Sequence, residues 1–354
     1  MQRAAALGYV DPPSRPVRVL SSTEAVGLER DRSARFRFRL PAHWKSPVFR
    51  NPHALHAERE VLAWFSRLGC TPEELARAAK FDAAGYVGIP FPGLSPEMSV
   101  RIGKYLSMWL LWDDVQIERL ESRWRIGAAD VLSGIAPAEM SRFDHGWWEL
   151  LGEFAARRSR RWVEDVCTAM ITWNEAAMIE AIAMKSHRDR GVLPGFALQL
   201  EMRIATIGMY ATVYLLEDTY DYELPRTFHA HPTVRRIKKL ANLLVGLGND
   251  IFSLGKDLAE GQINLVSTLL QEEMVSCDQA LEQLIGMHDA AIEEFDRLAA
   301  GIGSWGELDD RYIARWLQDV RYASLGFTLW EAQAPRYTAH KVVVDDKVLE
   351  PDVG

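Results

Sequence analysis

The stretch GNDIFSLGKD, residues 248–257, decides how this sequence is interpreted. Apolar residues around it recur every three or four positions, which is the spacing of a helix with a buried face. Successive helical residues turn by about 100°, so Asn249, Ser253 and Asp257 each lie about 40° from the last and form one stripe. An amide oxygen, a hydroxyl and a carboxylate together suit a divalent cation. The alternative is a polar helix face held by hydrogen bonds between residues four apart.

The ammonium group in the same stretch points to a second ligand. Lys256 lies about 20° from the stripe, on its other side. An ammonium group would repel a bare cation site, but it fits well if an anion binds there too. The stretch therefore predicts a metal that is shared between the protein and an anion such as diphosphate.

A second acidic cluster follows an aromatic stretch earlier in the chain. Residues 97–124 predict one long helix, which carries Asp113, Asp114 and Glu118 after Trp109. Asp114 and Glu118 are four residues apart and share a face. Like charges held together repel, so such a cluster needs solvent or a cation. A solvated helix end is the alternative, and the apolar residues before the cluster argue against it.

Helical patterning extends outward from these two stretches. From Asn51-Pro52, which we expect to cap and open a helix, to about residue 335, apolar residues keep the helical spacing almost throughout. No strand pattern of useful length and no internal repeat appears. The sequence predicts an all-α fold in one large domain. The breaks are expected at residues 85–96, 137, 191–194, 225–232 and 301–306.

The predicted domain organisation has three parts. Residues 1–35 are rich in Arg, Pro and Ser and are expected to form a flexible N-terminal leader. Residues 36–340 form the predicted helical domain, and residues 341–354 form a C-terminal tail.

Composition excludes several classes of protein. The chain of 354 residues has a formal net charge of −8 and lacks a strong basic patch, so a nucleic-acid partner is not expected. Its three cysteines are far apart and form no CxxC pair, which argues against a disulfide framework and favours a reducing cytoplasm. No run approaches the roughly 18 apolar residues that a membrane span needs.

Together, the two acidic stretches resemble the metal-binding motifs of the bacterial class I terpene synthases. Asp113-Asp114 with Glu118 resembles the aspartate-rich motif in its DDxxxE form, and residues 249–257 match (N/D)Dxx(S/T)xxx(D/E), with the usual lysine at 256. The departures are small: Glu118 replaces the last aspartate of a strict DDxxD, and Asp257 stands where glutamate is common.

Further residues carry the same resemblance over about residues 36–340. Arg203, Thr206 and Ile207 resemble the diphosphate-sensing arginine with its linker and effector residues on a kinked helix. Trp330 followed by Arg336-Tyr337 resembles the C-terminal W…RY signature. Arg321-Tyr322 is also an Arg-Tyr pair, but it lacks the preceding tryptophan and lies too close to the second motif.

The resemblance implies a helical bundle around a central apolar pocket and a Mg²⁺-dependent lyase of isoprenoid biosynthesis, acting on a prenyl diphosphate. Three Mg²⁺ ions would bridge the diphosphate to metal ligands at Asp113, Asp114, Glu118, Asn249, Ser253 and Asp257. The catalytic donors to the diphosphate would be Arg203, Lys256, Arg336 and Tyr337. The substrate pocket would be lined by Leu106, Trp109, Leu110, Thr206, Ile207 and Trp330.

The family favours farnesyl diphosphate and a cyclic sesquiterpene hydrocarbon or alcohol as product. Geranyl or geranylgeranyl diphosphate stays open as the substrate, and homodimers are frequent in the family. A chain-elongating prenyltransferase is the first rival, but the chain lacks the second DDxxD that such an enzyme would carry. A non-catalytic helical binding protein is the second, and it has no reason to combine these motifs.

Overall fold

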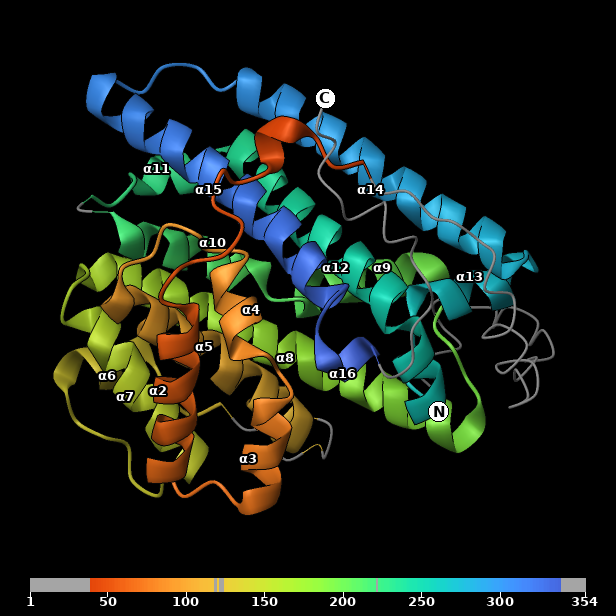
Figure 1. Cartoon of the computed structure of the whole chain (residues 1–354), viewed down its shortest axis with the longest axis horizontal. Coiled ribbons are helices and arrows are strands. Elements are labelled where there is room, and N and C mark those ends of the chain that lie inside the picture. Colours follow the sequence, from red (N-terminus) through yellow and green to blue (C-terminus); the bar gives the residue numbers. More distant parts are fainter. Residues whose placement is uncertain (1–38, 118–119, 121–123, 221, 339–354) are drawn as a thin grey trace, which may run out of the picture.

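The computed structural model describes residues 39–117, 120, 124–220 and 222–338. The predicted leader (1–35) and tail (341–354) lie outside these residues, and so does Glu118. The described residues form helices and connecting loops without a strand, which confirms the predicted all-α fold (Figure 1). None of the described helices combines the length and the apolar character needed to cross a bilayer.

The helices follow one another through short connections. Their bounds are η2 (Ala42–Trp44), α2 (Ala54–Arg67), α3 (Pro72–Ala79), α4 (Ala83–Gly88), α5 (Pro96–Trp112), η3 (Asp113–Ile117), α6 (Ala128–Ser133), α7 (Arg142–Ala155), α8 (Arg160–Arg190), α9 (Phe196–Thr206), α10 (Met209–Leu215), η4 (Leu216–Thr219), α11 (Arg226–Ala230), α12 (Pro232–Glu260), α13 (Leu265–Glu273), α14 (Cys277–Ala300), α15 (Glu307–Glu331) and α16 (Pro335–Thr338).

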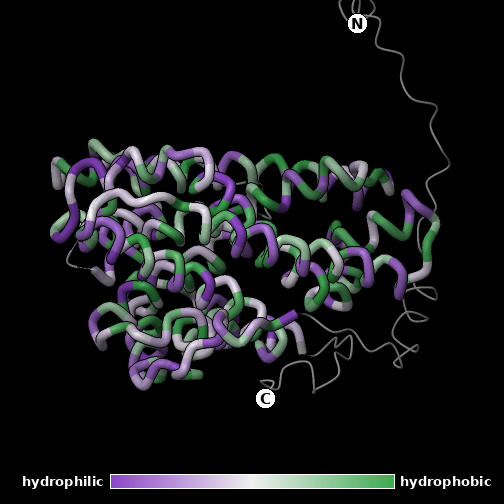
Figure 2. Tube along the Cα trace, turned by 90° about the horizontal axis from the view of Figure 1, so that it is seen from above, coloured by the Kyte–Doolittle hydropathy of each residue, from purple (hydrophilic) through white to green (hydrophobic). Residues whose placement is uncertain are grey.

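Helix α12 lies at the centre of the bundle. It packs against α14 and α15 and also contacts α9, α10 and α13, while α5 packs against α2, α4 and α7 on the other side of the molecule (Figure 1). Apolar and polar residues alternate every few positions along most helices (Figure 2), as expected of helices with one face in a core. The result is one large hydrophobic core and a smaller one formed by residues of α12, α13 and α14.

The predicted cap at Asn51 is wrong. Helix α2 begins at Ala54 with His53 as its N-cap. The Asn51 side chain is buried and accepts a hydrogen bond from the backbone N–H of His53 at 2.7 Å. Its amide nitrogen donates to the carbonyls of Phe91, Pro92 and Leu94. Asn51 therefore ties the start of α2 to the loop before α5. The predicted break at residues 85–96 overlaps the second part of the short helix α4.

The predicted helix over 97–124 is also shorter and less regular than expected. Helix α5 starts at Pro96, where the Ser95 hydroxyl accepts from the N–H of Met98, and it ends at Trp112. A π-helix, η3, follows directly over Asp113–Ile117. Such wide turns change which residues share a face, and they occur frequently at functional sites.

Candidate active site

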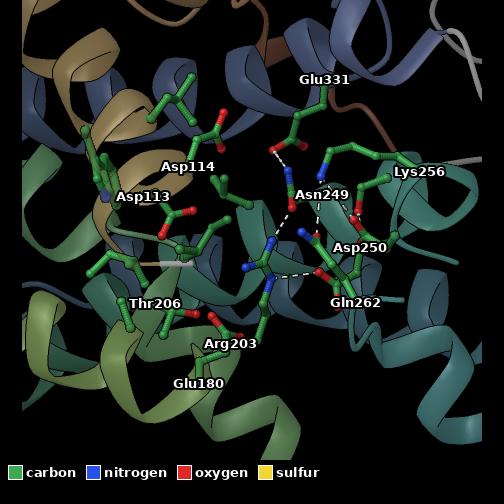
Figure 3. Close-up of a pocket in the computed structure, with 18 of the residues that line it drawn as sticks. Asp113, Asp114, Glu180, Arg203, Thr206, Asn249, Asp250, Lys256, Gln262 and Glu331 are labelled. Atoms are coloured by element: carbon green, nitrogen blue, oxygen red, sulfur yellow. Dashed lines mark hydrogen bonds and ion pairs between the residues drawn. The ribbon is translucent and has the colours of Figure 1, made fainter. Parts of the chain in front are cut away.

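A deep cavity opens between α5/η3, α8, α9–α10, α12, α15 and α16. The space between its walls amounts to about 1180 Å³, with the solvent at its mouth included. The predicted residues Asp113, Asp114, Asn249, Ser253 and Asp257 all line it. In Figure 3 the two aspartates lie on one side of the cavity, and Asn249 and Lys256 lie on the other. The two predicted motifs thus face one space.

The acidic wall lies where α5 passes into η3. Asp114 contacts two guanidinium groups: its Oδ2 lies 3.5 Å from Nη1 of Arg77, and its Oδ1 accepts from Nη2 of Arg336 at 3.4 Å. Asp113 is the first residue of the π-helix and also lines the cavity. Both carboxylates line the cavity, so either could contribute a metal ligand from this wall.

The opposite wall is the predicted stripe on α12. The Ser253 hydroxyl donates to Oδ2 of Asp257, which also accepts from the Asn264 amide at 2.8 Å. Lys256 lies beside them, with its Nζ 2.9 Å from Oε2 of Glu260. Burial disfavours its charge, but Asp257 raises the pKa of Lys256 above its ordinary value, so the ammonium stays protonated.

Arg203 connects α9 to the α12 wall. Its Nε lies 2.7 Å from Oδ1 of Asp250, and its Nη2 donates to the Asn249 side-chain oxygen. Burial opposes the charge of Arg203, but Asp250 and then Glu180 raise its pKa. Burial also raises the pKa of Asp250 to about 6, although Arg203 lowers it. The Asp250 carboxylate and the Asn249 side-chain oxygen hold the guanidinium at the cavity wall (Figure 3).

Arg336 and Tyr337 complete the cationic side from α16. The Arg336 guanidinium lies 5.4 Å from the ring centre of Phe81 and 5.3 Å from that of Tyr337. Burial opposes its charge, but Tyr337, Asp114 and Asp113 raise the pKa of Arg336. Within the described residues, its buried Nε and Nη1 have no hydrogen-bond partner. Two donor nitrogens without a partner at a cavity wall are a place for an anion.

The donor set fits magnesium and diphosphate together. Carboxylate, amide and hydroxyl oxygens are the ligands of hard cations, and Mg²⁺ needs few of them when phosphates supply others. The described residues contain no cluster of three or more His, Cys, Asp and Glu side chains that could enclose a metal by itself. The unused N–H groups of Arg336, together with Arg203 and Lys256, suit the diphosphate.

Aromatic side chains form the apolar part of the cavity. Trp109 and Trp173 meet edge to face with their ring centres 4.9 Å apart. Tyr86 stacks on Trp330 at 4.1 Å. Among the predicted pocket residues, Trp109, Leu110, Thr206, Ile207 and Trp330 line the cavity. Leu106 is not among these lining residues and is fully buried in the core, one turn before Leu110.

The predicted kink falls between α9 and α10. Gly208 has a φ of +87°, in the left-handed region that favours glycine. A Cβ built on it would lie 1.0 Å from Cη2 of Trp109, so the indole ring occupies that space. The Trp173 indole N–H donates to the carbonyl of Thr206 at 2.8 Å. Two tryptophans thus fix the break at the cavity.

Gly208→Ala is expected to lower the free energy of unfolding by about 2–5 kcal/mol. A left-handed backbone costs a non-glycine residue about 1–2 kcal/mol, and displacing a packed ring costs about 1–3 kcal/mol. Urea unfolding measures the difference. Gly152→Ala in α7 is the control, since nothing lies within 4 Å of its Cβ position and stability should hold or rise slightly. Equal stability of Gly208→Ala and wild type would contradict the packing described.

Three buried carboxyl residues of the site were not predicted from the sequence. Glu180 on α8, Asp250 on α12 and Glu331 at the end of α15 line the cavity. Asp250 lies inside the recognised motif and Glu331 directly follows Trp330, so both could have been considered, whereas nothing local marks Glu180. The other Arg-Tyr pair, Arg321-Tyr322, is not part of the site. Arg321 donates to Asp296 at 3.0 Å and is not among the residues that line the cavity.

Comparison with known proteins agrees with this fold. Residues 104–294 match the family model described as terpene synthase family 2, C-terminal metal binding. The chain belongs to this family and is a class I terpene synthase of the bacterial type.

Individual relatives are distant but cover most of the chain. The 10-epi-cubebol synthase of Sorangium cellulosum (strain So ce56) is 25% identical over 81% of this chain and 94% of its own length. The (+)-eremophilene synthase of the same organism is 24% identical, over 79% of this chain and 87% of its own. A crystal structure of a linalool/nerolidol synthase from Streptomyces clavuligerus is similar in fold, with a TM-score of 0.71 and 19% identity over 84% of this chain and 100% of that one.

Proposed function

We propose that this terpene synthase uses Mg²⁺ to ionise farnesyl diphosphate and cyclises the resulting cation to a sesquiterpene hydrocarbon or alcohol. One observation carries the proposal: oxygen-bearing side chains on η3 and on α12 face one cavity that also contains buried cations and an aromatic wall. The similarity to the 10-epi-cubebol synthase and the (+)-eremophilene synthase of Sorangium cellulosum supports a C15 substrate. Geranyl and geranylgeranyl diphosphates are the alternatives.

The residues proposed to hold the metal ions are those of the two walls. Asp113 would bind from η3, with Asp114 and Glu118 as further members of the motif, and Asn249, Ser253 and Asp257 would bind together from α12. When bound, Mg²⁺ supplies positive charge that stabilises the departing diphosphate. In the structure, the Asn249 side-chain oxygen accepts from Arg203 and the Ser253 hydroxyl donates to Asp257. These hydrogen bonds keep the stripe ordered.

The basic side chains and Tyr337 are proposed to bind the diphosphate. Nε and Nη1 of Arg336 have no hydrogen-bond partner within the described residues, and each is proposed to donate to an oxygen of the diphosphate. Lys256 offers a mobile point charge, and Arg203 is held in place by Asp250. Donors already in place where charge develops need little reorganisation, and this favours departure of the leaving group.

The aromatic wall is proposed to guide the cation. Trp109, Trp173, Phe327 and Trp330 present ring surfaces to the cavity. Attraction between a cation and a desolvated ring contributes about 2 kcal/mol. Since about 1.4 kcal/mol changes a ratio of rates tenfold, a single ring is enough to redirect the products.

Trp109→Ala is therefore expected to change the product mixture more than the KM for the diphosphate. The ring lines the cavity beside the helix break, and it contacts none of the proposed diphosphate donors through a hydrogen bond. Gas chromatography with mass detection measures the mixture. Trp305→Ala is the control, because Trp305 packs on Phe228 away from the cavity and the mixture should be unchanged. An unaltered mixture in Trp109→Ala would remove this ring from the proposed guidance.

The function is tested by incubation with C10, C15 and C20 prenyl diphosphates, with Mg²⁺ and with a chelator. We expect a cyclic C15 product and inorganic diphosphate, both dependent on Mg²⁺. A longer prenyl diphosphate would indicate a chain-elongating transferase. Absence of Mg²⁺-dependent turnover with all three substrates would contradict the proposal.

A further inference from the structure

Glu331 is a buried carboxyl at the boundary between the core and the cavity. It is the last residue of α15 and is 2% exposed. A Cβ on Gly248 would lie 3.2 Å from its Oε2 and 2.9 Å from the Thr328 hydroxyl, so α12 and α15 approach closely there. Burial raises the pKa of Glu331 well above its ordinary value. Removal of a carboxyl from water is unfavourable unless hydrogen bonds compensate for it, so the partners of Glu331 are informative.

The polar partner of Glu331 is the Asn249 amide. Asn249 Nδ2 donates to Oε1 of Glu331 at 3.0 Å and to the Tyr337 hydroxyl at 3.1 Å. Its Oδ1 accepts from Arg203, which can only donate. Acceptors on one side and a donor on the other fix which end of the amide faces which way (Figure 3).

No other side chain holds Glu331 within the described part of the chain. Its Oε2 is buried without a hydrogen-bond partner, and Oε1 is the atom that Asn249 contacts. The hydrogen bond to the Asn249 amide is therefore the main polar contact of the Glu331 carboxyl.

We propose that Glu331 is a positioning residue, which turns the Asn249 amide so that its oxygen is presented for a divalent cation. The inference rests on the proposed function, in which Asn249 is a metal ligand. Glu331 and Tyr337 hold the nitrogen end of the amide, so the oxygen end stays toward Arg203 and the cavity. Without Glu331 the amide keeps Tyr337 and Arg203 as partners but loses the shorter of its two acceptor contacts, so its orientation is less strictly fixed. Mutation of a group that orients a metal ligand typically lowers metal affinity by about 10–100-fold.

The test uses Glu331→Met, which keeps the volume but removes the acceptor, and Glu331→Gln, which keeps an acceptor oxygen. Thermal unfolding midpoints are measured against Mg²⁺ concentration at a fixed concentration of inorganic diphosphate, which needs no turnover. Thr328→Ala, one turn earlier on the same face of α15, is the matched control, because it changes the contact with Gly248 without touching Asn249.

We expect Glu331→Met to need about 10–100-fold more Mg²⁺ for the same stabilisation. Glu331→Gln should need at most about threefold more, because its side-chain oxygen can still accept from Asn249, and Thr328→Ala should behave as wild type. If Glu331→Met does not fold, Glu331→Ala replaces it in the same series.

Wild-type Mg²⁺ dependence in the variant without an acceptor would overturn the inference, and so would an equal loss in Glu331→Gln and Glu331→Met. A wild-type protein that gains no stability from Mg²⁺ and diphosphate would instead contradict the proposed function itself. The two failures are therefore distinguishable.

Discussion

Asn249→Ala is expected to lower kcat/KM for farnesyl diphosphate by about a thousandfold. The change removes an oxygen of the proposed α12 metal stripe, and removal of one preorganised stabilising group costs about 10²–10³ in rate. It also deprives Glu331 of its hydrogen-bond partner and Arg203 of one acceptor. Steady-state kinetics with product quantification measures the loss.

The loss should not come from unfolding. An unpartnered buried carboxyl costs about 1–3 kcal/mol of stability, which leaves a protein of ordinary stability folded. Asn242→Ala is the matched control: this buried amide lies on the same helix and donates to the carbonyl of Lys238 at 2.8 Å. Its activity should stay within about threefold of wild type, because it lies outside the cavity. Near wild-type activity in Asn249→Ala would remove this residue from the metal site.

Asp113→Ala is expected to cause a loss of similar size from the opposite wall, about a thousandfold in kcat/KM. Asp113 lines the cavity at the start of the π-helix, and neighbouring Asp114 has Arg77 and Arg336 as partners. Asp114 is therefore poorly placed to replace the lost carboxylate. The same assay measures the effect, together with the thermal unfolding midpoint.

The stability of Asp113→Ala should fall only slightly, because the lost attraction to Arg336 is partly offset by the loss of repulsion between the adjacent carboxylates. Glu164→Ala serves as the control for the loss of a carboxylate. Glu164 forms an exposed pair with Arg160 on α8, and its replacement should leave activity unchanged. Full activity of Asp113→Ala would contradict the acidic wall.

The sequence predicts the regular parts of this protein well, and the reason is physical. Helical spacing of apolar residues depends only on local geometry and on one shared core, so the all-α fold and the stripe on α12 could be predicted. The stripe keeps its spacing because α12 remains a regular helix over 29 residues. The kink at Arg203–Gly208 also lies where the resemblance places it, since a left-handed Gly208 ends the helix locally.

The departures all arise where tertiary contacts override the helical period. The change of α5 into a π-helix at Asp113 cannot be predicted from a spacing that assumes regular turns. Leu106 was expected on the pocket face, but the packing of α5 against α2, α4 and α7 places it in the core. Asn51 carries the residue type of a helix cap, but it binds a loop about forty residues later in the chain. Glu180 and Glu331 become site residues only because distant helices bring them to Arg203 and Asn249.

The most direct test of the central claim is a crystal structure with Mg²⁺ and inorganic diphosphate bound. We predict metal ions that contact Asp113 on one wall and Asn249, Ser253 and Asp257 on the other, with the diphosphate between them and against Arg336. Diphosphate bound elsewhere, or metal ions that touch neither the η3 nor the α12 side chains, would contradict the account.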